Sequence, residues 1–414
     1  MHQEKFDTMK RIILTCLEIG ASLLLATSCE NVDNNLRNED EGSSIYIEPK
    51  LVAAIISSIE LQAEQLSEVH DAVSSSSTNG YDEEYTMKQL FENPGSGVGE
   101  VASKSSRTYS APLRDLICNQ VKLMTATKAV SVDPEAFLDA LASSDMQIYW
   151  PFSEDWDGKT MPVITFDPED GSLNNIGYRF VSDDSGHHLE EVVVDEEFAM
   201  AEPVWVINRN SDAGYTSLEV LRREDPQWGE GGGAIIVKPM DMPSSRVQQS
   251  QARQTVSRAL ILKEFTMKRN YDTWFAGASE FFVKIGYLDN FTASTEAELK
   301  IFNPLVTDCM IVVKRKYLGI PQNINVILMS DWSVQMTSST FMITEDDGGT
   351  QTEWTCKAKV FIESKSYGVE ITIPVNSKDD IVWRGELSNK WIEDNSNKAW
   401  AFGDVELTFE LLEY

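Results

Sequence analysis

The pattern of apolar residues changes near residue 146, and this change limits the folds that the chain can adopt. Before it, apolar residues recur every three or four positions, which is typical of helices with one buried face. After it, short runs of aromatic and β-branched residues alternate with turn-forming residues, which is typical of strands. All ten tryptophans come at or after Trp150. We therefore expect an α+β protein, with an N-terminal helical region followed by two mainly antiparallel β units.

The helical region is predicted for residues 46–145. Its expected helices cover residues 49–72, 82–92, 113–124 and 134–142. The polar run 73–82 is expected to end the first of them. Pro112 suits the first turn of the third helix, and Asp133-Pro134 suits the start of the fourth.

The first β unit is predicted for residues 146–240. Its expected strands cover residues 147–152, 162–167, 176–182, 189–194, 203–208 and 233–239. The glycine-rich run 224–234 lacks the GxxxxGK[ST] pattern of a phosphate-binding loop, so we interpret it as a connector. Polar residues 241–258 are expected to form a linker.

The second β unit is predicted for residues 259–414. Its expected strands cover residues 259–268, 280–287, 297–302, 309–317, 323–329, 340–344, 356–363, 367–375 and 405–414. Strands at such even spacing, separated by polar turns, are typical of two packed antiparallel sheets. We therefore expect this C-terminal unit to be a β-sandwich.

Charge and composition exclude some functions. The formal net charge is −31, from 35 basic and 66 acidic residues, so phosphate backbones repel the chain and nucleic acid is not an expected partner. The four histidines and the absence of a CxxC pair argue against a zinc or redox site. A GxSxG motif is also absent. These features favour a protein that is not an enzyme, and the alternative is a hydrolase of a glycan or peptide that uses carboxylates or a metal.

Residues 1–28 have the pattern of a secretory signal. Lys10-Arg11 form the basic part, an apolar run follows, and small residues come before Cys29. The apolar run is too short to span a membrane, and Glu18 interrupts it. Translation could start at Met1 or Met9, since both starts leave this pattern intact.

The end of the signal, Leu25-Ala26-Thr27-Ser28-Cys29, resembles the lipobox of bacterial lipoproteins. The resemblance implies that Cys29 carries diacylglycerol and further acyl chains such as palmitate. Each buried CH₂ group then contributes about 0.8 kcal/mol to membrane binding. An ordinary cleaved signal is the alternative, since Ala26 stands where such motifs usually have Leu.

Residues 29–45 are acidic and lack an apolar period, so we expect a solvated tether. An acidic tether directly after the lipid cysteine resembles the surface-export signals of Bacteroidetes lipoproteins. That resemblance implies a protein of the cell envelope, attached to the outer membrane and facing either the cell surface or the periplasm.

Two acidic clusters between predicted strands of the C-terminal unit offer a metal site. Asp346 and Asp347 lie in one, and Asp379 and Asp380 lie in the other. Calcium prefers six to eight oxygen ligands, so these four carboxylates are candidate Ca²⁺ ligands. The alternative is that both clusters are simple turns, because Asp and Gly suit turn conformations.

Other motifs have plainer interpretations. The DxDG-like run 154–158 lacks the later ligands of an EF-hand and is expected to be a turn, and His187-His188 are expected at a hairpin rim. Cys309 and Cys356 could form a disulfide or stay as buried thiols. Six tryptophans in polar surroundings could contact sugars or a partner protein, or could close the ends of the sandwich: Trp156, Trp228, Trp332, Trp354, Trp391 and Trp400.

The spacing Trp274-x-x-Gly277-x-x-Glu280, followed later by Glu345-Asp346-Asp347-Gly348, resembles an uncharacterised family of secreted bacterial proteins over about residues 150–360. That family has no assigned activity, so the resemblance implies no catalytic residue. Together these features lead us to expect a lipid-anchored envelope protein that acts as a binding or structural module, with a glycan or a surface protein as its partner.

Overall fold

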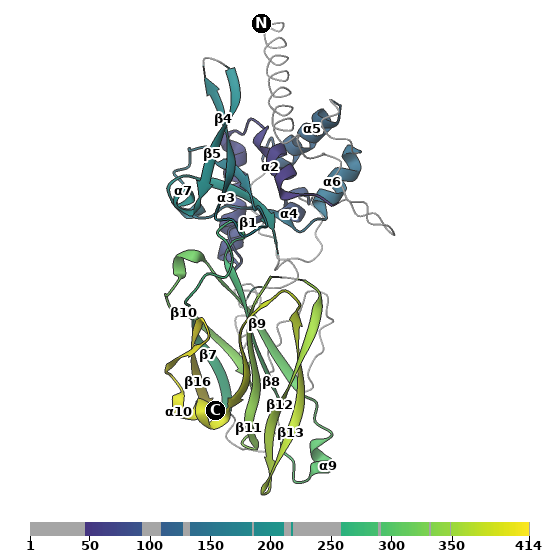
Figure 1. The fold of residues 1–414 in the computed structure, drawn as a ribbon, viewed down its shortest axis with the longest axis vertical. Coiled ribbons are helices and arrows are strands. Elements are labelled where there is room, and N and C mark those ends of the chain that lie inside the picture. The colour runs from purple at the N-terminus through teal and green to yellow at the C-terminus, as the bar shows by residue number, and fades with distance from the viewer. Residues whose placement is uncertain are drawn as a thin grey trace. The chain divides into compact units, whose positions relative to one another are not determined.

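The structure is a computed structural model that describes most of the chain after residue 45. The described residues are 46–92, 109–126, 133–183, 186–210, 217, 258–288, 291–330, 333–347 and 349–413. The signal, the tether, the glycine-rich run 224–234 and all but the last residue of the linker 241–258 lie outside them. The chain divides into two compact units (Figure 1). The N-terminal unit holds residues up to Asn210 together with Asp272–Gly277, and the C-terminal unit holds the rest.

The N-terminal unit combines helices with one sheet. Its α-helices are α2 (Pro49–Ser57), α3 (Ala63–Thr78), α4 (Met87–Phe91), α5 (Leu113–Ala126), α6 (Pro134–Ala142) and α7 (Glu196–Ala201), with a 3₁₀ turn η2 (Ser153–Asp155). Its strands are β1 (Glu84–Thr86), β2 (Met146–Tyr149), β3 (Val163–Phe166), β4 (Asn174–Asp183), β5 (Gly186–Asp195) and β6 (Val204–Arg209). The sheet order is β1-β2-β6-β3-β4-β5, and only the β3–β6 pair is parallel.

Helices α2 to α6 share one core with one face of the sheet. Alternate residues of β6 point to opposite faces, so Trp205 and Ile207 pack among the helices, where Val52, Leu66 and Ile117 are also buried. The predicted helical region 46–145 and the strands after it therefore form one unit. The change of pattern near residue 146 is a change of secondary structure inside that unit.

The prediction of one helix over residues 49–72 is wrong. Helix α2 ends at Ser57, and α3 starts at Ala63 and continues to Thr78 through the serine run that was expected to end it. The hydroxyls of Ser57 and Ser58 donate to the carbonyls of Ala53 and Ile55, at 2.6 and 2.7 Å, and these bonds compete with a continued helix. Residues 82–92, expected as a helix, form β1 and the short α4.

The opposite face of the N-terminal sheet is covered by α7 and by a segment from far along the chain, residues 272–277. Trp274 and Phe275 are buried against Val163, Val204 and Val206. The Asn208 side chain donates to the carbonyls of Phe275 and Ala276 at 2.9 and 2.6 Å, and the Trp274 indole donates to the Leu173 carbonyl at 2.9 Å. Six residues of the predicted C-terminal range 259–414 thus complete the N-terminal core.

We predict that Phe275→Ala destabilises the N-terminal unit by about 3–5 kcal/mol, because the substitution opens a cavity in a packed core. Urea unfolding followed by tryptophan fluorescence measures the loss. Val193→Ala on exposed β5 is the control and should change the free energy of unfolding by less than about 0.5 kcal/mol. Equal effects of the two substitutions would show that residues 272–277 do not support this core.

The C-terminal unit contains two antiparallel sheets. One has the order β10-β7-β16-β15, and the other has the order β13-β12-β11-β8-β9, with β14 also paired to β11. Its strands are β7 (Arg258–Met267), β8 (Ser279–Tyr287), β9 (Leu305–Val313), β10 (Gln322–Met329), β11 (Met336–Glu345), β12 (Gln351–Ile362), β13 (Lys365–Asn376), β14 (Asp380–Ser388), β15 (Ala399–Phe402) and β16 (Val405–Glu413). Short helical elements lie between them: α9 (Glu296–Leu299), η3 (Arg315–Tyr317) and α10 (Asn389–Asn395).

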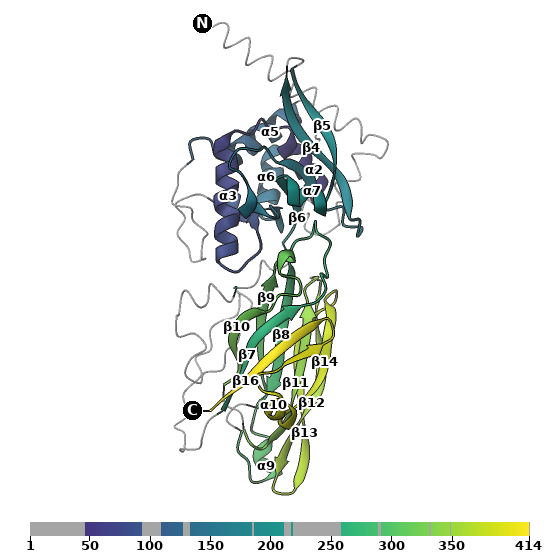
Figure 2. The same ribbon diagram turned by 90° about the vertical axis from the view of Figure 1, so that its left-hand side faces the viewer.

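The two sheets face each other across the largest core of this unit. Leu262 and Phe265 of β7 and Leu407 of β16 pack against Phe281 of β8 and Phe341 of β11. Figures 1 and 2 show β7 and β16 in one layer and β8 and β11 in the next. The chain is therefore a mixed α+β protein with sandwich-like sheets in its C-terminal part.

The β12–β13 hairpin covers the other face of β8. Strand β12 pairs with β11 only near Met336 and Ser338, and the hairpin then continues as a separate layer. A second apolar cluster lies beneath it, with Met342 of β11 packed against Ile371 and Ile373 of β13. As a result every residue of β8 is buried.

Most strand predictions for the C-terminal unit are confirmed, with two kinds of exception. Residues 297–302, predicted as a strand, contain the end of α9 and a turn, and Thr295 caps α9 by accepting a hydrogen bond from the Glu298 amide. The predicted strand 309–317 ends at Val313, and Arg315–Tyr317 form η3 instead. Strands β14 and β15 and helix α10 were not predicted. Within the described residues, no helix combines the length and the apolar character needed to cross a membrane.

We predict that Gly286→Ala destabilises the C-terminal unit by about 1–3 kcal/mol, because a Cβ at this position of β8 would clash with the Ile371 side chain of the hairpin. The Ile371→Ala background should remove most of this penalty. A double-mutant cycle on the free energy of unfolding measures the coupling. Additive effects would contradict the packing of the hairpin on β8.

Candidate cation site in the C-terminal unit

The structure brings two of the four predicted calcium ligands together. Asp346 follows β11 and Asp379 precedes β14, and both are bound by Asn376 at the end of β13. The Asn376 side chain donates to Asp346 Oδ1 at 3.3 Å, and its amide donates to Asp379 Oδ2 at 3.0 Å. Asp346 is 2% exposed and Asp379 is 9% exposed. They form a buried inner pair of carboxyl groups.

The turns that carry the inner pair are tied to each other. The Ser377 amide donates to the Thr350 carbonyl at 2.9 Å, and the Thr350 amide donates to the Ser377 hydroxyl at 3.1 Å. Gly349 has a φ of +103°, and a Cβ there would lie 2.8 Å from the Ser377 hydroxyl. The glycine therefore lets the two turns approach closely.

A buried ion pair lies beside the inner pair. Lys284 of β8 lies opposite Asp308 of β9, and its ammonium is 3.2 Å from Asp308 Oδ2. The same ammonium donates to the Pro374 carbonyl of β13 at 2.9 Å. The Lys284 side chain is only 4% exposed, so the β12–β13 hairpin seals this ion pair from solvent.

These groups shift one another's protonation. Burial and the neighbouring Asp346 carboxyl group raise the pKa of Asp379, whereas the Asn376 amide and the Lys284 ammonium lower it, and the net result is a pKa of about 7. Burial also raises the pKa of Asp308, which Lys284 lowers and Asp346 raises. Asp308, Asp346, Asp379 and Lys284 therefore act as one electrostatic group.

The other two predicted ligands, Asp347 and Asp380, form an outer pair. Burial, then the charges of Asp380 and Asp346, raise the pKa of Asp347, and Lys378 lowers it. The Asp380 side chain is 57% exposed and lies 3.9 Å from the guanidinium of Arg269. The four predicted residues thus gather at one end of the unit, but only Asp346 and Asp379 are enclosed.

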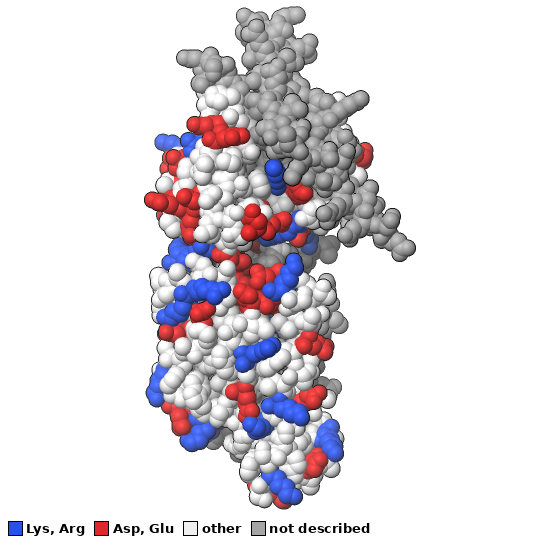
Figure 3. Space-filling model, in the orientation of Figure 1, with Lys and Arg blue, Asp and Glu red and all other residues white. Residues whose placement is uncertain are grey.

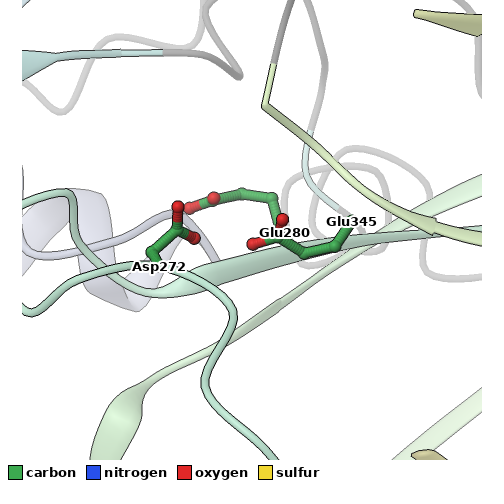
Figure 4. Close-up of side chains that lie close together, drawn as sticks. All are labelled: Asp272, Glu280 and Glu345. Atoms are coloured by element: carbon green, nitrogen blue, oxygen red, sulfur yellow. The ribbon is translucent and has the colours of Figure 1, made fainter. Parts of the chain in front are cut away.

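Two further carboxylates lie at the same end of β8 and β11. Glu280 and Glu345 are both buried, and each has a carboxylate oxygen within 4.8 Å of one in the other (Figure 4). The Asp346 amide donates to the Glu280 carbonyl at 2.9 Å, which joins this pair to the inner pair through the backbone. The third side chain in the figure, Asp272, belongs to the N-terminal segment 272–277, so the candidate site is defined on the C-terminal unit alone.

The enclosed acids contrast with the surface. Acidic and basic side chains are interspersed over the visible face of the C-terminal unit (Figure 3). Most ion pairs there are exposed, such as Lys390–Asp394 and Lys359–Glu386, and pairs of this kind contribute at most about 1 kcal/mol. Burial, rather than the overall acidity of the chain, is what distinguishes the candidate site.

The remaining sequence motifs are structural where they are described. Residues 154 and 155 belong to the 3₁₀ turn η2, and Asp157 accepts hydrogen bonds from the amides of Lys159 and Thr160, so the run 154–158 lies in turns as expected. His187 and His188 pair with Ser182 and Val181 in the β4–β5 hairpin.

The described tryptophans of the C-terminal unit pack on other rings or cations. Trp391 and Trp400 have centroids 5.4 Å apart, Trp391 also contacts Phe402, and Arg384 lies over Trp354. This arrangement favours the closure of one end of the sandwich. Cys309 is a buried free thiol and Cys356 is a half-buried one, so the two are not bridged. Trp228 and Trp332 lie outside the described residues.

Sequence reasoning missed Lys284 and Asp308. The signal was available, because each is a charged residue flanked by a mainly apolar run, in FFVKIGY and LVTDCMIVV. A charge on a strand that is buried on both faces needs a partner, and these two strands are neighbours.

No protein-family model, curated protein or solved structure matches this chain.

We predict that the stability of the C-terminal unit falls between about pH 4 and about pH 7 when cations are chelated. In this window folded Asp379 keeps a proton that the unfolded chain, with an ordinary Asp pKa near 4, has released. Raising the pH through the window therefore favours unfolding. Asp379→Asn should remove this loss and unfold at a higher temperature than the wild type at pH 8.

Thermal unfolding in EDTA at pH 5 and pH 8 measures this effect, which we expect to be on the order of 2 kcal/mol at pH 8. Glu370→Gln, an exposed acid on β13, is the control and should leave the pH dependence unchanged. The same pH dependence in Asp379→Asn as in the wild type would contradict the raised pKa.

Proposed function

We propose that this chain is a lipid-anchored protein of the bacterial cell envelope that acts as a binding or structural module. The observation that carries the proposal is the order of segments: a basic and apolar signal, Cys29 after small residues, an acidic tether, and then the folded units. Acyl chains on Cys29 would hold the protein at a membrane, and residues 29–45 would separate it from the lipid surface.

The strongly acidic composition supports this arrangement. The whole chain has a net charge of −31, which disfavours contact between the protein and anionic lipid headgroups, so the membrane contact falls to the anchor. We propose the outer membrane as the site of attachment, with the folded units on the cell surface or in the periplasm. A glycan or a surface protein is the proposed partner class.

The fold of the C-terminal unit supports the module interpretation over the hydrolase alternative. We propose that its two sheets and the covering hairpin make it a β-sandwich whose rigid layers present loops at their ends. The carboxyl groups of the inner pair, Asp346 and Asp379, are 2% and 9% exposed. Catalytic carboxylates must contact the bond that they cleave, so this burial disfavours such a role.

We predict that Cys29→Ser abolishes lipid labelling and releases the protein from the membrane fraction. Expression in a lipoprotein-processing bacterial host with a clickable palmitate analogue, followed by fractionation, measures both. Cys16→Ser, a cysteine inside the signal, is the matched control and should leave labelling intact. Labelling that persists in Cys29→Ser, or a wild-type protein found unlabelled in the medium, would refute the anchor.

A further inference from the structure

We propose that the inner pair, Asp346 and Asp379, binds a divalent cation beneath the β12–β13 hairpin of the C-terminal unit, and that Ca²⁺ is the ion its oxygen ligands favour. In the proposed envelope module, the bound ion stabilises the C-terminal unit. Its ligands come from the two turns at the end of β11 and β13, together with the buried groups that face them.

The charges of the buried group need a cation. Asn376 at the end of β13 binds the carboxylates of Asp346 and Asp379, and the Lys284 ammonium lies 3.2 Å from the Asp308 carboxylate and binds the Pro374 carbonyl of the same strand. When the three carboxyl groups and the ammonium are ionised, the group has a formal charge of −2. One proton leaves it at −1, whereas one divalent ion neutralises it. Buried charge that is not neutralised is costly, so the ion stabilises the folded state.

Unsatisfied oxygen atoms point to the same conclusion. Oδ1 of Asp379 and Oδ1 of Asp308 are buried and have no hydrogen-bond partner among the described residues. A proton shared between Asp346 and Asp379 could satisfy only Oδ1 of Asp379, and not Oδ1 of Asp308. A cation with its water ligands could serve both, because water bound to the ion donates hydrogen bonds to further acceptors.

An independent oxygen comes from Thr344. Its hydroxyl is buried and has no partner among the described residues. Met342 and Thr344 share one face of β11, and Met342 packs beneath the hairpin. Asp346 comes two residues after Thr344, and its amide still pairs with the Glu280 carbonyl of β8, so the alternation extends to it. The Thr344 hydroxyl therefore lies on the side of β11 that carries the Asp346 carboxylate. Hydroxyl, carboxylate and water oxygens are the ligands that hard cations such as Ca²⁺ prefer.

The surrounding structure is built to hold such an ion. Asn376 positions both carboxylates, and the paired hydrogen bonds between Thr350 and Ser377 fix the two turns. An ion between Asp346 and Asp379 would join the end of β11 to the start of β14. It would thereby hold the hairpin on β8, where the Lys284–Pro374 bond already attaches it.

The test is a thermal shift of the purified protein, first in EDTA at pH 8 and then with Ca²⁺ alone or Mg²⁺ alone. A cation present at 100 times its Kd should raise Tm by roughly 5–10 °C. Calorimetric titration with Ca²⁺ should give one site per chain. The rise should disappear in Asp379→Asn and Asp346→Asn.

Asp380→Asn is the matched control, because Asp380 is the exposed neighbour of Asp379 and should keep most of the shift. Far-UV circular dichroism in EDTA checks that each variant is folded, so that a lost shift reports the loss of a ligand. The proposal is overturned if neither cation raises Tm. It is also overturned if Asp379→Asn keeps the full shift, which would place the ion elsewhere. A pH-dependent stability without any cation response would assign the inner pair a shared proton only. None of these outcomes depends on Cys29.

Discussion

Strand β8 is buried along its whole length, and the arrangement of the C-terminal unit follows from this constraint. A strand in a simple two-sheet sandwich buries one face and exposes the other. Here the sheet of β7 and β16 covers one face of β8, and the β12–β13 hairpin covers the other. Gly286 allows the hairpin to approach, because any side chain there would meet Ile371.

Because β8 is buried on both faces, the charged side chain of Lys284 lies away from solvent. An ammonium group in that layer is tolerated only with close partners, which are Asp308 and the Pro374 carbonyl. The hairpin that buries the lysine thus also supplies one of its hydrogen bonds. The acidic turns that follow β11 and β13 lie at the edge of the same layer, so the candidate site and the packing of the hairpin depend on each other.

The N-terminal unit shows a different dependence on distant sequence. Its sheet is covered on one face by helices that precede it in the chain, and on the other partly by residues 272–277. Asn208 satisfies two carbonyls of that segment, so the segment is held by hydrogen bonds as well as by the burial of Trp274 and Phe275. The two units are compact, but neither corresponds to one continuous stretch of chain.

The local sequence was sufficient to predict those helices and strands whose signals, such as prolines, caps and alternating apolar residues, lie within or beside the element itself. Pro112 before α5, the Asp133 cap and Pro134 of α6, the alternation in β2 to β6, and the runs of β7 and β8 predicted helices and strands close to the observed ones. It failed where side chains compete with the backbone, as Ser57 and Ser58 do after α2, and where a short polar turn such as Thr295–Glu298 forms a helix in a sequence with apolar residues. The acidic turns were also recognisable, because clustered Asp and Gly between strands are visible in the sequence.

Most helices and strands, and the two separate acidic turns at Asp346-Asp347 and Asp379-Asp380, were therefore determined by the sequence itself, since each depends on residues that are close in the chain. Only the tertiary structure decided which of these acids are enclosed, and that Lys284 and Asp308 lie beside them. The physical reason is that desolvation depends on what covers a group. The β12–β13 hairpin covers the buried group that contains Lys284. Pro374 of this hairpin, whose carbonyl binds the Lys284 ammonium, lies ninety residues further along the chain.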